Sequence, residues 1–436
     1  MTGQELIMEH LTRVFGEMEA NLNGSAGNPL HQFQKKAFTT LRNIDFPGRK
    51  HEDWKYTPVQ KILAPSYHLA GQLPGKHLEA IPGLDSHVIE IINGRINVDA
   101  AAKELTAAGV QLITLAEALN SPERKATLDS FLSQQVPDSN RAFDFLNLSF
   151  TSNGIWIDIP KGLKVNKPIE IRIHHYDTNV SFSHPLVFVH CGQESEVTFF
   201  ERYEGEASSA SINEGFINSL LLFKIKAAAR ILHIKWQDLP AQQNLVYKLA
   251  TTQERDSFFQ TFAFDKGGKI VRNNVEVDML ESNTYTSLQA GFTVNDKQSM
   301  DHQTRIHHLV HHCESHEHYK GIIDDQGSGA FNGKVYVHQD AQKTNAYQQN
   351  DTLVLSPNAV MNSKPQLEIF ADDVKCSHGA TIGQLDAKAL FYLKSRGITE
   401  EQATTILKSA FLATILNQVP VEPIRQYIAG NLDMEI

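Results

Sequence analysis

A cysteine and a histidine two residues apart, Cys376 and His378, form a pair of side chains that could bind a metal ion. Successive side chains of a β-strand point to opposite faces, so residues two apart share a face, with Cα atoms roughly 6.5–7 Å apart. Thiolate sulfur and imidazole nitrogen both suit zinc, copper or iron. Two ligands make half a site, so the others would come from elsewhere in the fold or from another chain. The alternative is a structural core pair, because Val374 shares the same face and free cysteine is often buried.

A second cluster of candidate ligands lies in the segment 299–324, which is rich in histidine. Such tracts can bind metal, and clustered imidazoles can instead make a region pH-sensitive. The tract contains no HExxH motif, and its histidines fall on both faces of any regular element. We expect Asp301, Glu314 and Glu317 to be ordinary solvated partners. The candidate ligands are His302, His307, His308, His311, His312, Cys313, His316 and His318.

Motifs for self-contained catalysis are missing from the sequence. Gly268-Lys269 and Gly333-Lys334 are not followed by the Ser or Thr of a phosphate loop, and no G-x-S-x-G pattern occurs. The adjacent pairs Asp324-Asp325 and Asp372-Asp373 are more typical of turns than of a catalytic acid pair. The sequence therefore offers no self-contained active site.

The central region is expected to be built from short strands separated by Gly, Asn, Asp and Pro, starting at about residue 149. This texture is typical of a sandwich, a barrel or a β-solenoid. No repeat motif decides between them, but over 200 residues without a helical break favour a solenoid. The expected strands include 154–160, 168–175, 184–191, 195–203, 269–280, 334–340, 350–355 and 365–372.

Helices are expected on both sides of this region. Apolar residues recur every three or four positions within residues 1–135, which predicts a mainly helical start. In the segment 46–63, we interpret Trp54 and Tyr56 as fastening the helical domain to the rest, rather than as a binding site. The expected domains are 1–140, helical; 141–385, the β core; and 386–436, helical.

The C-terminal unit shows clear helix signals. Asp386 can cap a helix that stops at Gly397, and Thr399 with Gln402 fits a capping box for a second helix that Pro420 ends. Such a unit could be core or a docking surface for a partner. The apolar face of the second helix consists of Ala403, Ile406, Leu407, Ala410, Phe411 and Thr414.

Composition excludes several classes of protein. The 436 residues carry a formal net charge of −10, which argues against general nucleic-acid binding. The first residues do not resemble a signal peptide, and no apolar run approaches the length of a membrane span. Three cysteines argue against a disulfide framework and for reduced thiols. We therefore expect a cytoplasmic protein that binds neither nucleic acid nor membrane.

The segment Phe331 to Ile398 closely resembles the SufB/SufD family of iron–sulfur cluster assembly proteins, and His312 to Lys334 extends the match upstream. Within this family, the stretches KCSHGATIGQLD and RKHEDWKYT are similar to SufD rather than to SufB. The resemblance is dense over about 120 residues and thinner over the N-terminal 140.

This resemblance implies a right-handed parallel β-helix core with N-terminal and C-terminal helical domains. It also implies pairing with SufB through the β-helix, binding of SufC, an ABC-type ATPase, by the C-terminal helices, and a role in iron entry. A family histidine that ligates the cluster at the SufB interface matches His378, and Cys376 is the second candidate ligand. The cluster would be transient and shared with the partner, with no cofactor bound tightly in the isolated chain. The residues expected to contact SufC are Asp386, Leu390, Phe391, Thr399, Ile406, Leu407, Ala410 and Phe411.

The hypothesis from sequence is therefore a non-catalytic scaffold that supplies His378 and Cys376 to a cluster at a subunit interface, and forms a homodimer when isolated. One alternative is a stand-alone homodimeric iron-binding or carrier protein. Another is a β-helix carbohydrate-active enzyme, which predicts a groove lined with converging carboxylates and aromatic rings.

Overall fold

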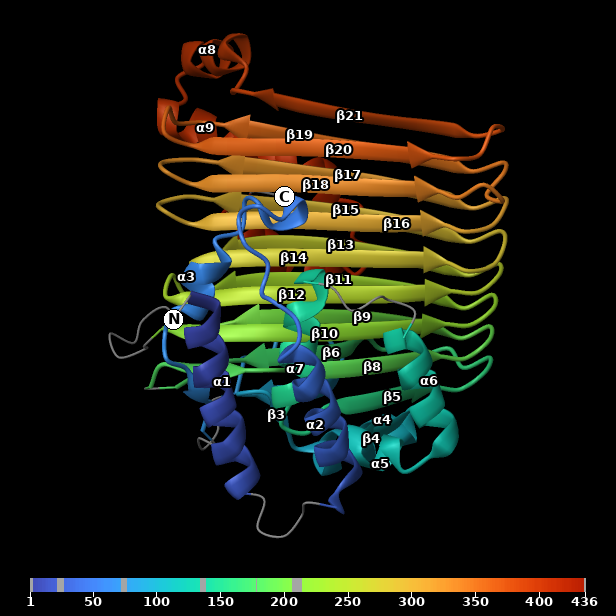
Figure 1. The fold of residues 1–436 in the computed structure, drawn as a ribbon. Helices are drawn as coiled ribbons and strands as arrows, with labels where there is room; N and C mark the ends of the chain where they lie inside the picture. Colours follow the sequence, from blue (N-terminus) through green and yellow to red (C-terminus); the bar gives the residue numbers. More distant parts are fainter. Residues whose placement is uncertain are drawn as a thin grey trace.

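The computed structural model describes residues 3–21, 27–71, 77–133, 139–177, 179–205 and 214–434. Its centre is a parallel β-helix of about eight turns, flanked by helices from both ends of the chain (Figure 1). The mainly β fold with a parallel β-helix core that the sequence predicts is confirmed.

Two sheets, here named sheet A and sheet B, form the β-helix, and each full turn contributes one strand to each sheet. Pairing is parallel and in register, so that Ile270, Ser299 and Ser328 occupy equivalent positions on three successive strands of sheet A. Sheet A consists of β20 (Val360–Ile369), β18 (Ser328–Val337), β16 (Ser299–His308), β14 (Ile270–Met279), β12 (Gln243–Gln253), β10 (Gly215–Ile225), β8 (Leu186–Cys191), β5 (Ile155–Ile159) and β4 (Gln111–Thr114). In addition, β7 (Ser181–Ser183) pairs with β10, and β1 (His68–Leu69) pairs with β7. Sheet B consists of β21 (Lys375–Gly383), β19 (Asn345–Val354), β17 (Glu314–Ile323), β15 (Tyr285–Val294), β13 (Phe258–Gly267), β11 (Arg230–Leu239), β9 (Glu196–Glu204), β6 (Ile169–His174), β2 (His87–Ile92) and β3 (Arg95–Ile96).

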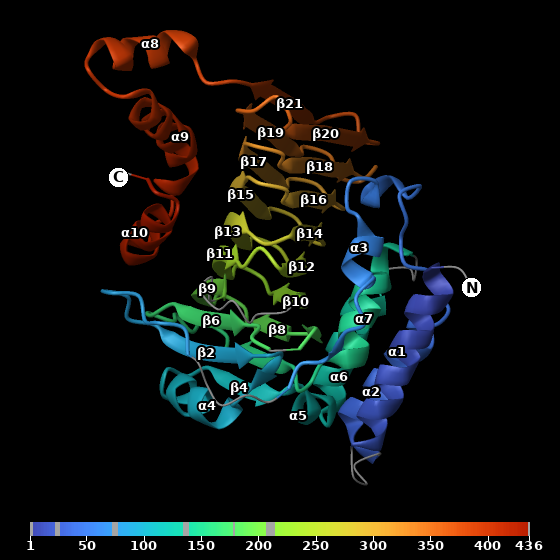
Figure 2. The ribbon, with the colours of Figure 1, turned by 90° about the vertical axis from the view of Figure 1, so that its left-hand side faces the viewer.

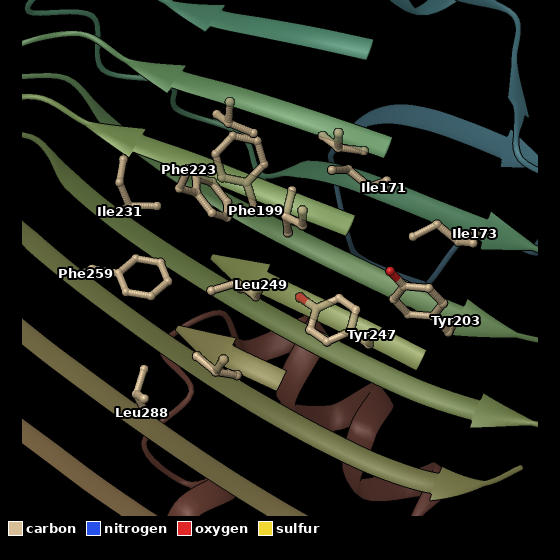
Figure 3. Close-up of a cluster of buried hydrophobic side chains, with 14 of the residues drawn as sticks. Ile171, Ile173, Phe199, Tyr203, Phe223, Ile231, Tyr247, Leu249, Phe259 and Leu288 are labelled. Carbon is tan, nitrogen blue, oxygen red and sulfur yellow. The ribbon is translucent and has the colours of Figure 1, made fainter. Parts of the chain in front are cut away.

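The main apolar core fills the space between the two sheets. Rings and aliphatic side chains such as Phe199, Phe223 and Phe259 stack along it from turn to turn (Figure 3). At the N-terminal end, helix α4 (Val98–Ala107) closes this interior with Ala101 and Leu105. No further turn follows β20 and β21, so the β-helix is closed at its first turn and open at its last.

The turns that lead into the strands of sheet B repeat one backbone conformation. Six equivalent turn residues have φ between 58° and 61°, the left-handed region that most side chains avoid. Each of their amides donates to a carbonyl in the neighbouring turn, so the stacked turns satisfy each other's hydrogen bonds. These residues are Glu194, Ala228, Asp256, Asn283, His312 and Lys343. His312 of the histidine-rich tract is thus a turn residue.

N-terminal helices cover the outer face of sheet A, as Figure 2 shows. Short strands are also present in this part of the chain, and β2, β3 and β4 extend the two sheets from before residue 141. The domain limits at residues 140 and 385 stay predictions. The helical elements are α1 (Gly3–Ala20), α2 (Pro29–Leu41), η2 (Glu52–Trp54), α3 (Val59–Leu63), α5 (Leu115–Leu119), α6 (Pro122–Ser133), η3 (Ser139–Arg141) and α7 (Ala142–Phe150).

The segment 46–63 fastens these helices to sheet A, as the sequence predicts for Trp54. Its indole is buried between the ring of Phe143, 5.0 Å away, and the guanidinium of Arg272 on β14, 4.1 Å from the ring centroid. Beside it, the carboxylate of Asp53 accepts from Lys334 at 2.7 Å and also pairs with Arg305. Tyr56 is only half-buried, so Trp54 carries most of this attachment.

The C-terminal helices cover the outer face of sheet B. Helices α9 (Glu400–Leu416) and α10 (Glu422–Asn431) pack on Phe200, Trp236 and Phe264, whereas α8 (Ala387–Ser395) extends past β21 (Figure 2). The predicted caps are confirmed: Asp386 accepts from the amide of Lys388, and Thr399 forms a capping box with its N3 residue. Helix α10 is not among the helices predicted from the sequence. No helix among the described residues has the length and apolarity to cross a lipid bilayer.

Candidate metal-ligand site at the open end of the β-helix

The predicted ligand pair lies on β21, the edge strand of sheet B, which pairs with β19 on one side. Cys376 packs against the inward-facing residues Val335 and Ala346, so its side chain faces the interior. His378, two residues further, shares this inward face. The structure therefore confirms the strand and the shared face, and the role of the two side chains as metal ligands stays a prediction.

The environments of the two side chains differ. Cys376 is half-buried in the small apolar cluster of the last turn, and burial raises the pKa of its thiol. A raised pKa keeps the sulfur protonated at neutral pH, and the thiol must lose that proton to bind a metal. His378 is exposed, although it faces inward, because no further turn covers it. Of the two, His378 is the side chain that another molecule can reach directly.

Behind His378, two buried polar residues occupy the same register column. Gln348 on β19 pairs with His378, and Glu317 on β17 pairs with Gln348. Both are buried, and the amide nitrogen Nε2 of Gln348 donates to the carboxylate of Glu317. The expectation that Glu317 and Asp301 are solvated partners is wrong, since both are buried. Sequence reasoning missed this column because inward and outward positions are not distinguishable until the register is known.

Burial raises the pKa of Glu317 to about 7, from an ordinary value of 4.5. The folded protein therefore keeps this proton up to about pH 7, whereas the unfolded chain releases it above about pH 4.5. Stability must fall as the pH rises between these values. We expect Glu317→Gln to abolish this decline, so that the urea midpoint of the variant exceeds that of the parent at pH 8 but not at pH 4. If the urea midpoints of the variant and the parent differed by the same amount at both pH values, the prediction would be contradicted.

The histidine-rich tract does not converge on one site. His302 and His308 are buried in the core, His307 stacks on Tyr336 on the outer face of sheet A, and His316 and His318 lie on the outer face of sheet B. Burial lowers the pKa of His302 and of His307 to about 4, so these two imidazoles are neutral at physiological pH. In the part of the chain that the structure describes, no group of three or more His, Cys, Asp or Glu is arranged to hold a metal ion.

A cleft of about 550 Å³ lies beside His378 on sheet B. Two tyrosines and two further histidines line it, but among its lining residues the one acid is Glu317, whose side chain is buried. Hydrolysis of a glycosidic bond ordinarily uses two facing carboxyl groups. The cleft therefore does not support the carbohydrate-enzyme alternative. Its lining includes Tyr285, His316, His318, Tyr347, Gln349, Ser377 and Gln418.

The residues predicted to contact a partner on the C-terminal helices are uncovered. Asp386, Phe391, Thr399, Ile406 and Ala410 are exposed, and Leu390, Leu407 and Phe411 are half-buried. The apolar face predicted for α9 is not the face that packs in the core. Among the six residues predicted for that face, only Ala403 is buried. The face that packs on sheet B contains Ala403, Ser409, Leu412, Ile415 and Leu416. Helix α9 thus presents one apolar face to the β-helix and leaves another open to solvent.

The fold and the site together define a parallel β-helix protein with two candidate metal-binding side chains, Cys376 and His378, at its open end. The model of the SufBD core domain of the SUF system for iron–sulfur cluster assembly matches residues 173–411, and the model of the SufBD N-terminal region matches residues 6–171. The chain belongs to the SufBD family, which assigns it a role in iron–sulfur cluster assembly. The family resemblance stated from the sequence is confirmed.

Curated relatives match over nearly the whole chain. The iron–sulfur cluster assembly protein SufD of Escherichia coli (strain K12) is 27% identical over 407 residues, covering 91% of this chain and 90% of that protein. An iron–sulfur cluster assembly SufBD family protein of Synechocystis sp. is 28% identical over 428 residues, covering 94% and 93%. The similarity therefore includes both helical ends as well as the β-helix.

Proposed function

We propose that this chain is a SufD-like scaffold that pairs with SufB through the open end of its β-helix. In this proposal it also carries SufC on its C-terminal helices, and assists iron entry and nascent cluster assembly without catalysing a reaction itself. The observation that carries the proposal is the uncovered last turn of the β-helix.

The last turn lacks the features that normally protect the end of a solenoid. The outer edges of β20 and β21 have no neighbouring strand, and exposed strand edges invite pairing with another chain. Solenoids are ordinarily closed by a terminal unit with a polar outer face, yet this end exposes Phe370 by 62% and Ile382 by 51%. A second β-helix that docks end to end would pair the edges and cover these side chains.

The position of His378 suits a ligand set that is shared between two chains. Its imidazole is exposed at this end, and a docked partner would enclose it. An imidazole and a thiol are suitable donors for iron, but two donors leave a tetrahedral site half filled. The cluster is then the cargo of the complex, held between subunits and passed on. Cys376 would join the set after losing its thiol proton.

The C-terminal helices provide a second surface for a partner. Phe391 on α8 is 73% exposed, and Tyr392 on α8 and Ile406 on α9 are also exposed. Exposed apolar patches mark interaction sites. Because α8 extends past β21, a SufC molecule bound there would lie next to the subunit interface (Figure 2).

Anaerobic co-expression with SufB and SufC tests this proposal. We expect one complex that contains all three chains and an iron–sulfur cluster, and we expect His378→Ala to keep the complex but lose most of its iron and sulfide. Ser377→Ala, on the opposite face of β21, is the matched control and should keep both. If the chain purified without SufB and SufC, the scaffold role would be excluded. If His378→Ala left the iron and sulfide content unchanged, the role of His378 as a ligand would be excluded.

Measurement of molecular mass in solution distinguishes the scaffold hypothesis from the alternative of a stand-alone homodimeric carrier. A second copy of the chain can cover the same open end, so the isolated chain is expected to be a dimer. Addition of SufB should convert this dimer into a heterodimer. A homodimer that persists in excess SufB would favour the stand-alone carrier instead.

A further inference from the structure

The amide of Gln348 is held in place on two sides. Its nitrogen Nε2 donates to Glu317 one turn below, in the interior of the β-helix. Across the interior, Gly333 on β18 approaches so closely that a Cβ atom there would clash with this amide. His378 occupies the next register position on the same inward face. The amide therefore has little freedom to move, because it is hydrogen-bonded to Glu317 and the backbone of Gly333 lies close against it.

One hydrogen-bonding group of this amide is unused. The oxygen Oε1 of Gln348 is buried and accepts no hydrogen bond within the described chain. A buried acceptor without a donor is unfavourable, so such groups in folded proteins call for an explanation. Adjacent strands of a sheet lie about 4.8 Å apart, which places this oxygen within reach of the side chain at position 378.

An imidazole that binds a metal through one ring nitrogen carries a proton on the other. That N–H almost always donates to a carboxylate, a carbonyl or a water, and the hydrogen bond fixes the orientation of the ring. No hydrogen-bond partner of His378 lies among the described residues. Gln348 offers the carbonyl oxygen that such a bond requires.

We propose that Gln348 is a positioning residue for His378, with its Oε1 accepting the imidazole N–H when the other ring nitrogen binds iron. Glu317 fixes the direction of this oxygen by accepting the opposite end of the amide. The inference rests on the proposed function, because it takes His378 as a ligand. It adds that the interior of this chain determines how the exposed imidazole is presented.

The test measures ferrous iron alone, by anaerobic equilibrium dialysis against the complex of this chain with SufB and SufC. Gln348→Met keeps the length of the side chain but removes the acceptor, and is expected to weaken iron binding by about 10–100-fold. Gln348→Glu keeps an acceptor oxygen and should restore most of the affinity. Gln349→Met is the matched control, because Gln349 points to the outer face and donates to Asp351 at 2.7 Å. The complex with this variant should bind iron as tightly as the parent complex.

A double-mutant cycle separates positioning from a general loss of structure. In the His378→Ala background, Gln348→Met should have no further effect on iron affinity, whereas a merely structural defect would persist. Should Gln348→Met unfold the chain, Glu317→Gln and Glu317→Met provide the second comparison. The first keeps an acceptor for the Gln348 amide and should bind iron normally, and the second removes it and should bind iron more weakly.

The outcomes distinguish this inference from the proposed function. If His378→Ala leaves iron binding unchanged, His378 is not a ligand and the proposed function fails. If His378→Ala weakens binding but Gln348→Met does not, or if the two effects add, the positioning role of Gln348 is overturned and the ligand role of His378 stands.

Discussion

Replacement of Asp265 by alanine is expected to lower the free energy of unfolding by about 3–5 kcal/mol, because it removes one partner of a fully buried ion pair. Asp265 on β13 pairs with Lys235 on the neighbouring strand β11, inside the β-helix. The side chain of Lys235 is 1% exposed. Its ammonium group also donates to Asn273 at 3.1 Å and lies 4.8 Å from the ring centroid of Tyr247. These neutral contacts cannot replace a carboxylate, so the variant would leave a positive charge in the core.

Chemical denaturation followed by circular dichroism measures this effect. The matched control is Asp373→Ala, which breaks the ion pair with Lys343 in an exposed turn and should leave the midpoint nearly unchanged, because surface pairs contribute little. The double variant Lys235→Met with Asp265→Leu should recover much of the lost stability, since it removes both charges. Equal losses for Asp265→Ala and Asp373→Ala would show that burial does not determine the strength of the pair.

The architecture was predictable to the extent that it depends on local texture. Short strands, frequent turn residues and a long region without helices indicate a β-solenoid, and the caps of α8 and α9 follow from Asp386 and Thr399. The register was not predictable. Val271, Met300, Gly329 and Met361 occupy one column on successive strands of sheet A, but they are not of one residue type, and the chain between the last two is longer than between the earlier ones. Pairing between strands, rather than a repeated motif, sets their positions.

The candidate site shows the same division between local and long-range information. The spacing of Cys376 and His378 was sufficient to predict one shared strand face. The exposure of His378 depends on its place in the last turn, which no local pattern reveals. Glu317 lies between His316 and His318, so a polar stretch of sequence concealed an inward position. Alternation with Ser315 and Tyr319, which are both buried, was the one local sign of its burial.

Replacement of Trp54 by alanine is expected to lower the free energy of unfolding by about 3–5 kcal/mol, the range for large aromatic side chains in a core. Trp54 is 2% exposed, and its Nε1 donates to Asn140 at 2.9 Å. Its loss would leave a cavity beside Phe143 and would expose one face of Arg272, which pairs with Asp301 at 2.7 Å in a buried contact.

Hydrogen exchange locates this effect, because Trp54 joins the N-terminal segment to sheet A. In Trp54→Ala, amides of the segment 52–57 and of α7 should exchange faster, while those of β17 and β19, at the other end of the β-helix, should keep their protection. Trp54→Phe retains a ring between Phe143 and Arg272 and should lose less stability, and Tyr56→Ala is the half-buried control. Uniform deprotection of all strands in Trp54→Ala would instead mean that the N-terminal segment and the β-helix unfold as one cooperative unit.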